Sequence, residues 1–141
     1  MNWENIIEEG KYVLAVFGGL AVSLVGGWDK LLYTLIVMAS VDYTTGVIAA
    51  FYQKKLSSEI GSKGIIKKFL MFVIVAVAVQ LDTLLNSDFL RSMAIMFYVG
   101  TEGISILENV ANCDLPIPQP IKDALVKVKK EGEGNVSQNS N

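Results

Sequence analysis

"FLMFVIVAVAVQL", residues 69–81, has no charge and no polar face. The run "YVLAVFGGLAVSLVGGW", residues 12–28, has the same character. A helix of a soluble bundle carries a polar face at a period of 3.6 residues. Helices that are apolar all round belong in lipid or at the centre of a large protein, and 141 residues cannot wrap two central helices. The sequence therefore favours a membrane protein over a soluble four-helix bundle.

The predicted fold is an all-α integral membrane protein with about four transmembrane helices. No uncharged run reaches the 18 residues that settle a span by length alone. Reading through single acidic residues gives spans at 12–28, 31–53, 69–87 and 90–110. Residues 1–112 then form a transmembrane domain. Residues 113–141 form a cytoplasmic segment with three alternate prolines, a short amphipathic helix of a turn or two, and a disordered tail at 131–141.

The composition excludes several classes of function. The chain is 52% hydrophobic and 18% charged, and its formal net charge of -2 provides no global basic field for nucleic acid. It contains no histidine, and Cys113 is its one cysteine. Disulfide frameworks, Cys/His zinc sites and histidine bases are therefore absent. We expect neither an enzyme nor a bound cofactor.

Lysine positions predict the orientation. Cytoplasmic loops of membrane proteins are rich in lysine and arginine. One basic group lies in the link between the second and third spans, and another follows the fourth span. The first is Lys54, Lys55, Lys63, Lys67 and Lys68; the second is Lys122, Lys127, Lys129 and Lys130. Both termini are then cytoplasmic, and Asp29–Lys30 forms a tight outer turn.

Two interpretations of the link at 53–68 remain open. Its lysines alternate with apolar residues, which suits a segment lying along the anionic inner leaflet. A plain solvated loop fits equally well. The acidic N-terminus is unlike a secretory signal, so we expect the first helix to be retained.

Acidic side chains inside the predicted spans are the candidate functional residues. In "VMASVDYTTGV", residues 37–47, Asp42 stands at the centre of a span, where ionisable groups usually face a partner, a cavity or water. The polar or lumen-lining candidates are Asp42, Thr45, Gly46, Gln80, Asp82, Glu102 and Ser105. No predicted span has a basic residue at matching depth, so internal ion pairs are not expected. Contact between helices, a lumen-lining role and a proton or ion relay all remain open.

Small residues recur every fourth position in the first predicted helix. They are Ala15, Gly19, Ser23 and Gly27. Such ladders let helix backbones approach closely. The ladder predicts a packing face, either within one subunit or between subunits.

Two longer stretches resemble a known family. "MASVDYTTGVIAAFYQKKLSSEIGSKGIIKKFLMFVIVAVAVQLD" (38–82) combines an intramembrane Asp, a Thr-Gly step, a lysine-rich link and an apolar span closing in Asp. "YVGTEGISILENVANCDLPIPQPIKDAL" (98–125) adds "EGISILEN" and "PIP" before a basic helix. In this order the elements resemble the toxin-secretion/phage-lysis holin family. The matching pattern residues are Asp42, Gly46, Asp82, Glu102, Ser105, Glu108 and Asn109.

The resemblance implies a protein that forms homo-oligomers in the lipid of the bacterial cytoplasmic membrane. The oligomers would open lesions that release a muralytic enzyme (endolysin) or a toxin, without necessarily contacting it. Family members often have three spans, which would place the first helix on the surface or make it re-entrant. The alternatives are a small ion or proton conductor that uses Asp42, Asp82 and Glu102, and a non-conducting membrane scaffold.

Overall fold

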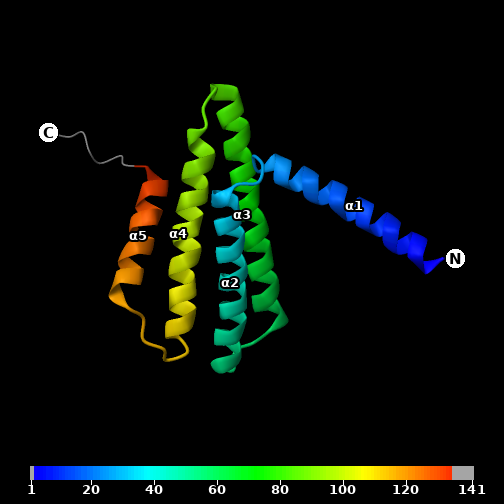
Figure 1. Cartoon of the computed structure of the whole chain (residues 1–141). Helices are drawn as coiled ribbons and strands as arrows, with labels where there is room; N and C mark the ends of the chain where they lie inside the picture. The colour runs from blue at the N-terminus through cyan, green and yellow to red at the C-terminus, as the bar shows by residue number, and fades with distance from the viewer. Residues whose placement is uncertain (1, 135–141) are drawn as a thin grey trace.

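The computed structural model describes residues 2–134, and every regular element in that range is an α-helix (Figure 1). The predicted all-α class is therefore confirmed for the described residues. The five helices are α1 (Trp3–Leu24), α2 (Lys30–Tyr52), α3 (Ser58–Leu85), α4 (Phe89–Ala111) and α5 (Gln119–Glu133). The expected tail lies mostly at residues 135–141, outside the described range, and its first three residues belong to α5.

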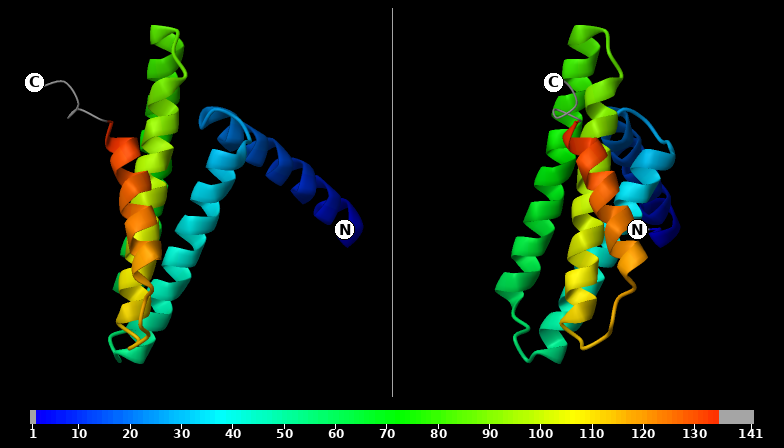
Figure 2. Two further views of the ribbon diagram at one scale, coloured as in Figure 1. Left: turned by 60° about the vertical axis from the view of Figure 1, so that its left-hand side comes forward. Right: turned by 90° about the vertical axis from the view of Figure 1, so that its left-hand side faces the viewer.

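Helix α4 is the central element of the bundle. It packs against α2, α3 and α5, whereas α2 and α3 meet each other at few positions (Figure 2). The largest fully buried side chains come from the three helices that share this core: Leu32 and Leu35 on α2, Val75 on α3 and Ile95 on α4. The bundle has a turn end, at residues 86–88 between α3 and α4, and a link end, at residues 53–57 between α2 and α3.

Two of the described helices, α2 and α3, are long and apolar enough to cross a membrane. They contain most of the expected spans at 31–53 and 69–87. Helix α4 closely matches the expected segment at 90–110, although acidic residues and glycines lower its hydropathy. The number of spans beyond two therefore stays a prediction.

Helix α1 differs from the predicted first span at 12–28. It begins at Trp3 and ends at Leu24, because Gly26 and Gly27 both adopt a φ of +90°. The N–H of Gly27 donates to the carbonyl of Val22 (2.9 Å), which closes the C-terminus in the manner of a glycine C-cap. Gly27 thus lies in the turn, and the expected four-step ladder has three helical positions.

Arg91 on α4 holds the turn between α1 and α2. Its Nε donates to the carbonyl oxygen of Val25 (2.6 Å), and its Nη1 donates to Asp29 Oδ2 (2.6 Å). Asp29 also caps α2, since its Oδ1 accepts from the N–H of Leu32 (2.8 Å). The Arg91 hydrogen bond holds the pKa of the Asp29 carboxyl below its usual range. The expected tight Asp29–Lys30 turn is instead a clamped segment over residues 25–29.

Helix α3 begins eleven residues before the predicted span. Ser57 is its N-cap, with Oγ accepting from the N–H of Ile60 (3.2 Å), and Glu59 stands in the first turn, where a negative charge favours the helix. The expected surface link at 53–68 is therefore wrong in extent. It covers only 53–57, and Lys63, Lys67 and Lys68 belong to α3.

Helix α5 is longer than the expected turn or two, and it packs antiparallel along α4. Pro118 is its N-cap residue and Pro120 lies in the first turn, where proline is tolerated. Glycines make the close approach possible: a Cβ at Gly100 would lie 2.6 Å from the Cα of Lys129, and one at Gly103 would lie 2.5 Å from Leu125. A Cβ at Gly132 would overlap the backbone of Phe97. We call these three glycines the α4–α5 seam.

Substituting Gly100 with alanine tests the seam. Alanine favours a helix interior by about 1 kcal/mol over glycine, so any loss must come from crowding against the backbone of Lys129. We expect Gly100→Ala to loosen α5 and to speed tryptic cleavage at its lysines several-fold in detergent micelles. Gly18→Ala is the control, because no atom lies within 4 Å of a Cβ there. Equal cleavage of the two variants would contradict the packing described here.

Candidate functional site

Three charged side chains from three helices meet inside the bundle. Lys68 of α3 donates through Nζ to Asp42 Oδ2 on α2 and to Glu102 Oε2 on α4. The side chains are 16%, 11% and 5% exposed, respectively, so the group is largely screened from the surroundings. We call Asp42, Lys68 and Glu102 the buried charge triad.

Asn109 completes the shell around Asp42. Its Nδ2 donates to Asp42 Oδ1 (3.1 Å) and lies 3.1 Å from Thr45 Oγ1. The Thr45 hydroxyl donates to the carbonyl of Val41 (2.8 Å), which leaves its oxygen free to accept from Asn109. Within residues 2–134, no buried side-chain nitrogen or oxygen lacks a partner. Both carboxylate oxygens of Asp42 are thus engaged.

The triad corrects the expectation that no basic residue lies level with Asp42. When spans are counted from uncharged runs, Lys68 falls just outside the third predicted span, because every lysine ends such a run. The structure extends α3 beyond that point, and Lys68 then stands one residue before the apolar segment and opposite Asp42. The sequence feature that indicates this role is the position of Lys68, directly before the apolar run at 69–81.

Two carboxylates share one ammonium in this group. When all three are ionised they carry a net charge of -1, and charges taken out of water are costly unless paired and hydrogen-bonded. Lys68 pairs with both acids, and Asn109 supplies a neutral donor to one of them. The arrangement links three helices through charge, and removal of one member changes the balance for the other two.

The remaining predicted polar residues do not join the triad. Asp82 accepts from the backbone N–H groups of Leu90 (2.9 Å) and Arg91 (2.8 Å), so it caps the first turn of α4. It stands fourteen residues after Lys68, about 21 Å along α3. Gln80 is exposed and Ser105 is half-buried. A lumen-lining role for these residues stays a prediction.

Gly46 lies beside the triad. A Cβ there would be 3.5 Å from Asn109 Nδ2, an ordinary contact. The position therefore has room for a methyl group, and its place in the family pattern has no explanation in this packing.

The five lysines of the predicted basic link have different surroundings. Lys54 and Lys55 are exposed in the turn, Lys63 pairs with Glu59 on the surface of α3 (2.6 Å), and Lys68 is in the triad. Lys67 is exposed beside the pocket that α3 and α4 form near Glu102. Membrane-surface binding by this group is a prediction that now concerns four of the five residues.

The small-residue face of α1 has no partner helix within the described part of the chain. Ala15, Gly19 and Ser23 are all exposed, and no atom lies within 4 Å of a Cβ built at Gly19. Packing within the subunit, one of the two expected uses of this face, is not present in this structure. A role between subunits stays a prediction.

The fold is a small helical bundle in which two of the described helices are long and apolar enough to cross a membrane and three charged side chains are buried between helices. The family model for the bacteriophage holin family matches residues 19–130. The chain belongs to this family, and the predicted resemblance is confirmed.

One of the relatives supports this assignment by its name. The chain is 34% identical over 108 residues to the "Probable holin" of Bacillus phage phi105, covering 76% of this chain and 80% of the relative. It is 43% identical over 130 residues to an uncharacterized 14.9 kDa protein in the nagH 3′ region of Clostridium perfringens, covering 91% and 98%. YqxH of Bacillus subtilis is 40% identical over 113 residues, covering 79% and 80%. No solved structure matches the chain.

Replacing Lys68 tests the triad. Lys68→Met leaves two buried carboxylates without their cation, and breaking a buried pair costs about 3–5 kcal/mol. We expect the midpoint temperature of thermal unfolding in detergent to fall strongly. Lys63→Met is the matched control, because the Glu59–Lys63 pair is more than 70% exposed and such pairs contribute at most about 1 kcal/mol. Adding Asp42→Asn and Glu102→Gln to Lys68→Met should recover part of the loss. Equal melting of the two single variants would contradict the triad's role.

Proposed function

We propose that this chain is a holin, which assembles in the bacterial cytoplasmic membrane and opens lesions that release a muralytic enzyme or a toxin. Host cell lysis follows when a muralytic enzyme is released. The observation that supports this proposal most strongly is a bundle with one charged side and one apolar side, in a chain that belongs to the holin family. The protein catalyses no reaction in this scheme.

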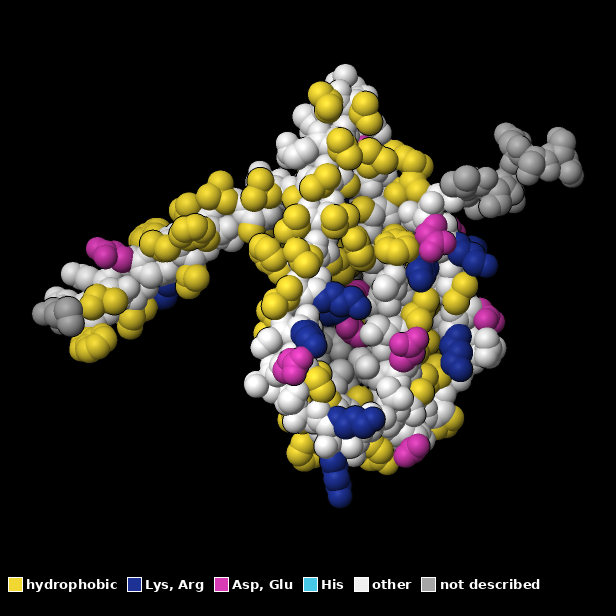
Figure 3. All heavy atoms as spheres, turned by 180° about the vertical axis from the view of Figure 1, so that it is seen from behind, with side chains coloured by type: hydrophobic (Ala, Val, Ile, Leu, Met, Phe, Trp, Pro, Cys, Tyr) yellow, Lys and Arg dark blue, Asp and Glu magenta, His cyan; other side chains and the backbone are white. Residues whose placement is uncertain are grey.

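The charged side is formed by α5. Lys122, Lys127 and Lys130 are exposed along it. Space-filling atoms show charged side chains over the link end and on the side where α5 lies, while hydrophobic side chains cover the turn end (Figure 3). Exposed apolar residues continue along α2 and α3, with Ile48 54% and Val77 49% exposed. The charged α5 side suits water, and the apolar side formed by α2 and α3 suits lipid.

An isolated subunit in lipid cannot satisfy both sides while α5 is docked. Helix α5 runs beside α4 over most of its length, so docking brings its lysines to the depth of α4. A lysine at the centre of a membrane helix costs about 2.5–3.5 kcal/mol. Subunits that turn their α5 sides towards shared water avoid this cost. The lumen of a lesion is such an environment.

We therefore propose two positions for α5. Before opening, α5 lies at the cytoplasmic membrane surface, and α1, α2, α3 and α4 cross the membrane, so that both chain termini are cytoplasmic. When the lesion fills with water, α5 docks on the seam and lines the lumen. The proline-containing segment at 112–118 joins α4 to α5 and permits the movement. The buried charge triad keeps α2, α3 and α4 together in both states.

Timed lysis tests the function. We would induce the chain in bacteria with and without a cytoplasmic muralytic enzyme, and follow a membrane-potential dye, culture density and a folded cytoplasmic reporter. We expect a delay, then abrupt depolarisation with reporter escape, and lysis that requires the enzyme. Depolarisation without reporter escape would instead support a narrow ion pathway. A membrane that stays sealed would point to a scaffold.

A disulfide between α4 and α5 tests the docking step. Gly103→Cys and Leu125→Cys, in a Cys113→Ala background, place two thiols at the seam, and the shorter side chain at 125 makes room for the new one at 103. We expect oxidation of isolated membranes to join them only in samples taken after depolarisation. Gly103→Cys alone is the control for other thiol reactions. Complete joining before opening would contradict the two-position scheme.

A further inference from the structure

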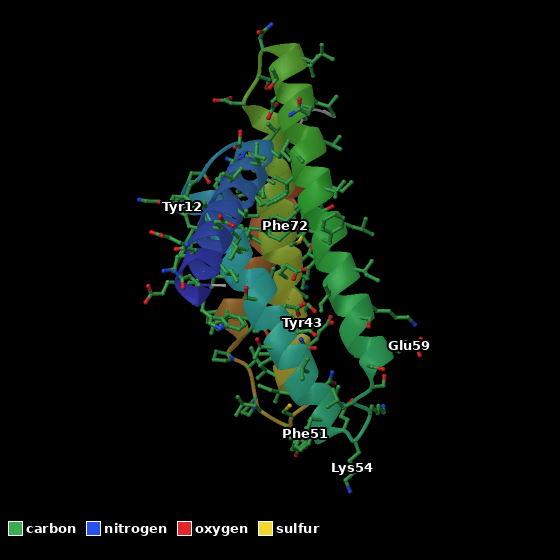
Figure 4. The ribbon with its side chains drawn as sticks, turned by 90° about the vertical axis from the view of Figure 1, so that its right-hand side faces the viewer. Tyr12, Tyr43, Phe51, Lys54, Glu59 and Phe72 are labelled. Atoms are coloured by element: carbon green, nitrogen blue, oxygen red, sulfur yellow. The ribbon has the colours of Figure 1, made fainter. Side chains whose placement is uncertain are left out.

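An apolar groove runs between α2 and α3 on the side of the bundle away from α5. It has a volume of about 600 Å³. Its lining includes Leu32, Ile36, Ala39, Tyr43, Ile65 and Phe72. Figure 4 shows Tyr43 and Phe72 on this side, with α4 and α5 behind them. The groove exists because α4 stands between α2 and α3 and keeps them apart.

Helix α1 is apolar from Tyr12 to Leu24 and makes no extensive contact with the other described helices. None of its residues is buried, and large side chains such as Phe17 (67% exposed) and Leu20 (57%) stand free. It leaves the bundle at an angle from a turn beside the groove (Figure 2). Only its last residues, including Ala21 and Val22, reach the groove's edge.

The turn holds α1 in this direction. Arg91 binds the carbonyl oxygens of Val25 and Gly27 as well as the Asp29 carboxylate. The two glycines at φ +90° complete a bend that few other residues adopt. Because this bend holds α1 away from its own bundle, the apolar surface of α1 is available for contact with another molecule.

We propose that the α2–α3 groove receives helix α1 of a second copy of this chain. The lengths agree: the groove follows α2 from Leu32 to Thr44, about 18 Å, and the apolar part of α1 from Tyr12 to Leu24 is also about 18 Å long. The small face of α1, with Gly19 at its centre, then meets small residues of α2, including Ala39 and Ser40. Contact between small residues allows the close backbone approach that drives helix association in lipid.

Charge determines the orientation of the second copy's α1 in the groove. The N-terminal part of α1 carries Glu4, Glu8 and Glu9. With this part towards the link end, the acids approach Lys54, Lys55 and Lys63. The reverse orientation brings them to the turn end, where Lys30 and Arg91 are balanced by Asp29 and Asp88 and no net positive charge attracts them. Complementary charges thus select one orientation, in which each α1 runs antiparallel to the α2 beside it.

This interface rests on the proposed assembly of a holin and supplies a contact for it. Each copy offers one helix and one groove, so the contact is heterologous and one copy can follow another in a ring or chain. The groove faces away from α5, so the contact lies on the lipid side of the assembly and leaves the α5 side open to water.

Two differently tagged copies test the interface in membranes. Both carry Cys113→Ala; one adds Gly19→Cys on α1, and the other adds Ser40→Cys in the groove. We expect mild oxidation to give a product with both tags, at least several-fold more than when Gln80→Cys, on the exposed side of α3 outside the groove, replaces Ser40→Cys. No excess over this control would overturn the proposal and leave lipid chains as the occupant. A doubly substituted chain that loses both thiols without forming a dimer would overturn it in favour of the chain's own α1.

Charge reversal tests this orientation. Glu8→Lys with Glu9→Lys on the first copy should lower the mixed product several-fold, and Lys54→Glu, Lys55→Glu and Lys63→Glu on the second copy should restore it. Failure of this restoration would overturn the orientation. Reporter escape is measured on the same cultures. Mixed product without escape would support the interface and oppose the holin function, whereas escape without mixed product would do the reverse.

Discussion

The ammonium of Lys68 lies between two carboxylates from two other helices, and the arrangement of α2, α3 and α4 depends on it. Each of these helices contributes one charge, and none can leave without exposing the others to a poorly solvating interior. In a membrane, apolar surface alone selects no particular neighbour, because lipid chains are as apolar as leucine. A buried ionic group selects both partner and register. Asn109 and Thr45 extend that selection along α2 and α4, so Asp42 is held from two directions.

Several features of this fold could be read from local patterns. The ends of α2 and α4 were predicted to within one residue or two, because Asp29 and the segment after Ala111 interrupt apolar runs at those points. Asp42, Asp82 and Glu102, singled out as acidic residues inside predicted spans, are buried in this structure, and a lumen-lining role for them stays a prediction. Lys68 was missed because hydropathy counting treats every lysine as the end of a span. The seam was missed because Gly100, Gly103 and Gly132 have meaning only once α5 folds back on α4, a contact between segments that no short-range pattern specifies.

The same glycines explain how a charged helix can lie against α4. Helix α5 packs Leu125 and Val128 inward, and its closest approaches to α4 are at glycine positions where a larger side chain would not fit. Lys129 is held over the Phe97 ring, with Nζ 5.6 Å from the ring centre, so its aliphatic part packs while its charge stays near the surface. Close backbone approach and apolar contact together hold this pair of helices. An interface of that kind tolerates water on its outer side, which lipid-facing helices do not.

A subunit with these parts has unsatisfied surfaces of three kinds. The lysines of its α5 side favour water. Its apolar α2–α3 groove favours an apolar helix, and its own α1, which has an apolar surface, is held away from that groove. Lipid satisfies the second and third only partly and the first not at all. The proposed assembly of many copies would satisfy all three together, with grooves filled by neighbouring α1 helices on the lipid side and α5 helices around a shared aqueous space. In this proposal, the surfaces that a single molecule leaves exposed are the ones that favour assembly, and the lysines of α5 favour an assembly with a water-filled centre.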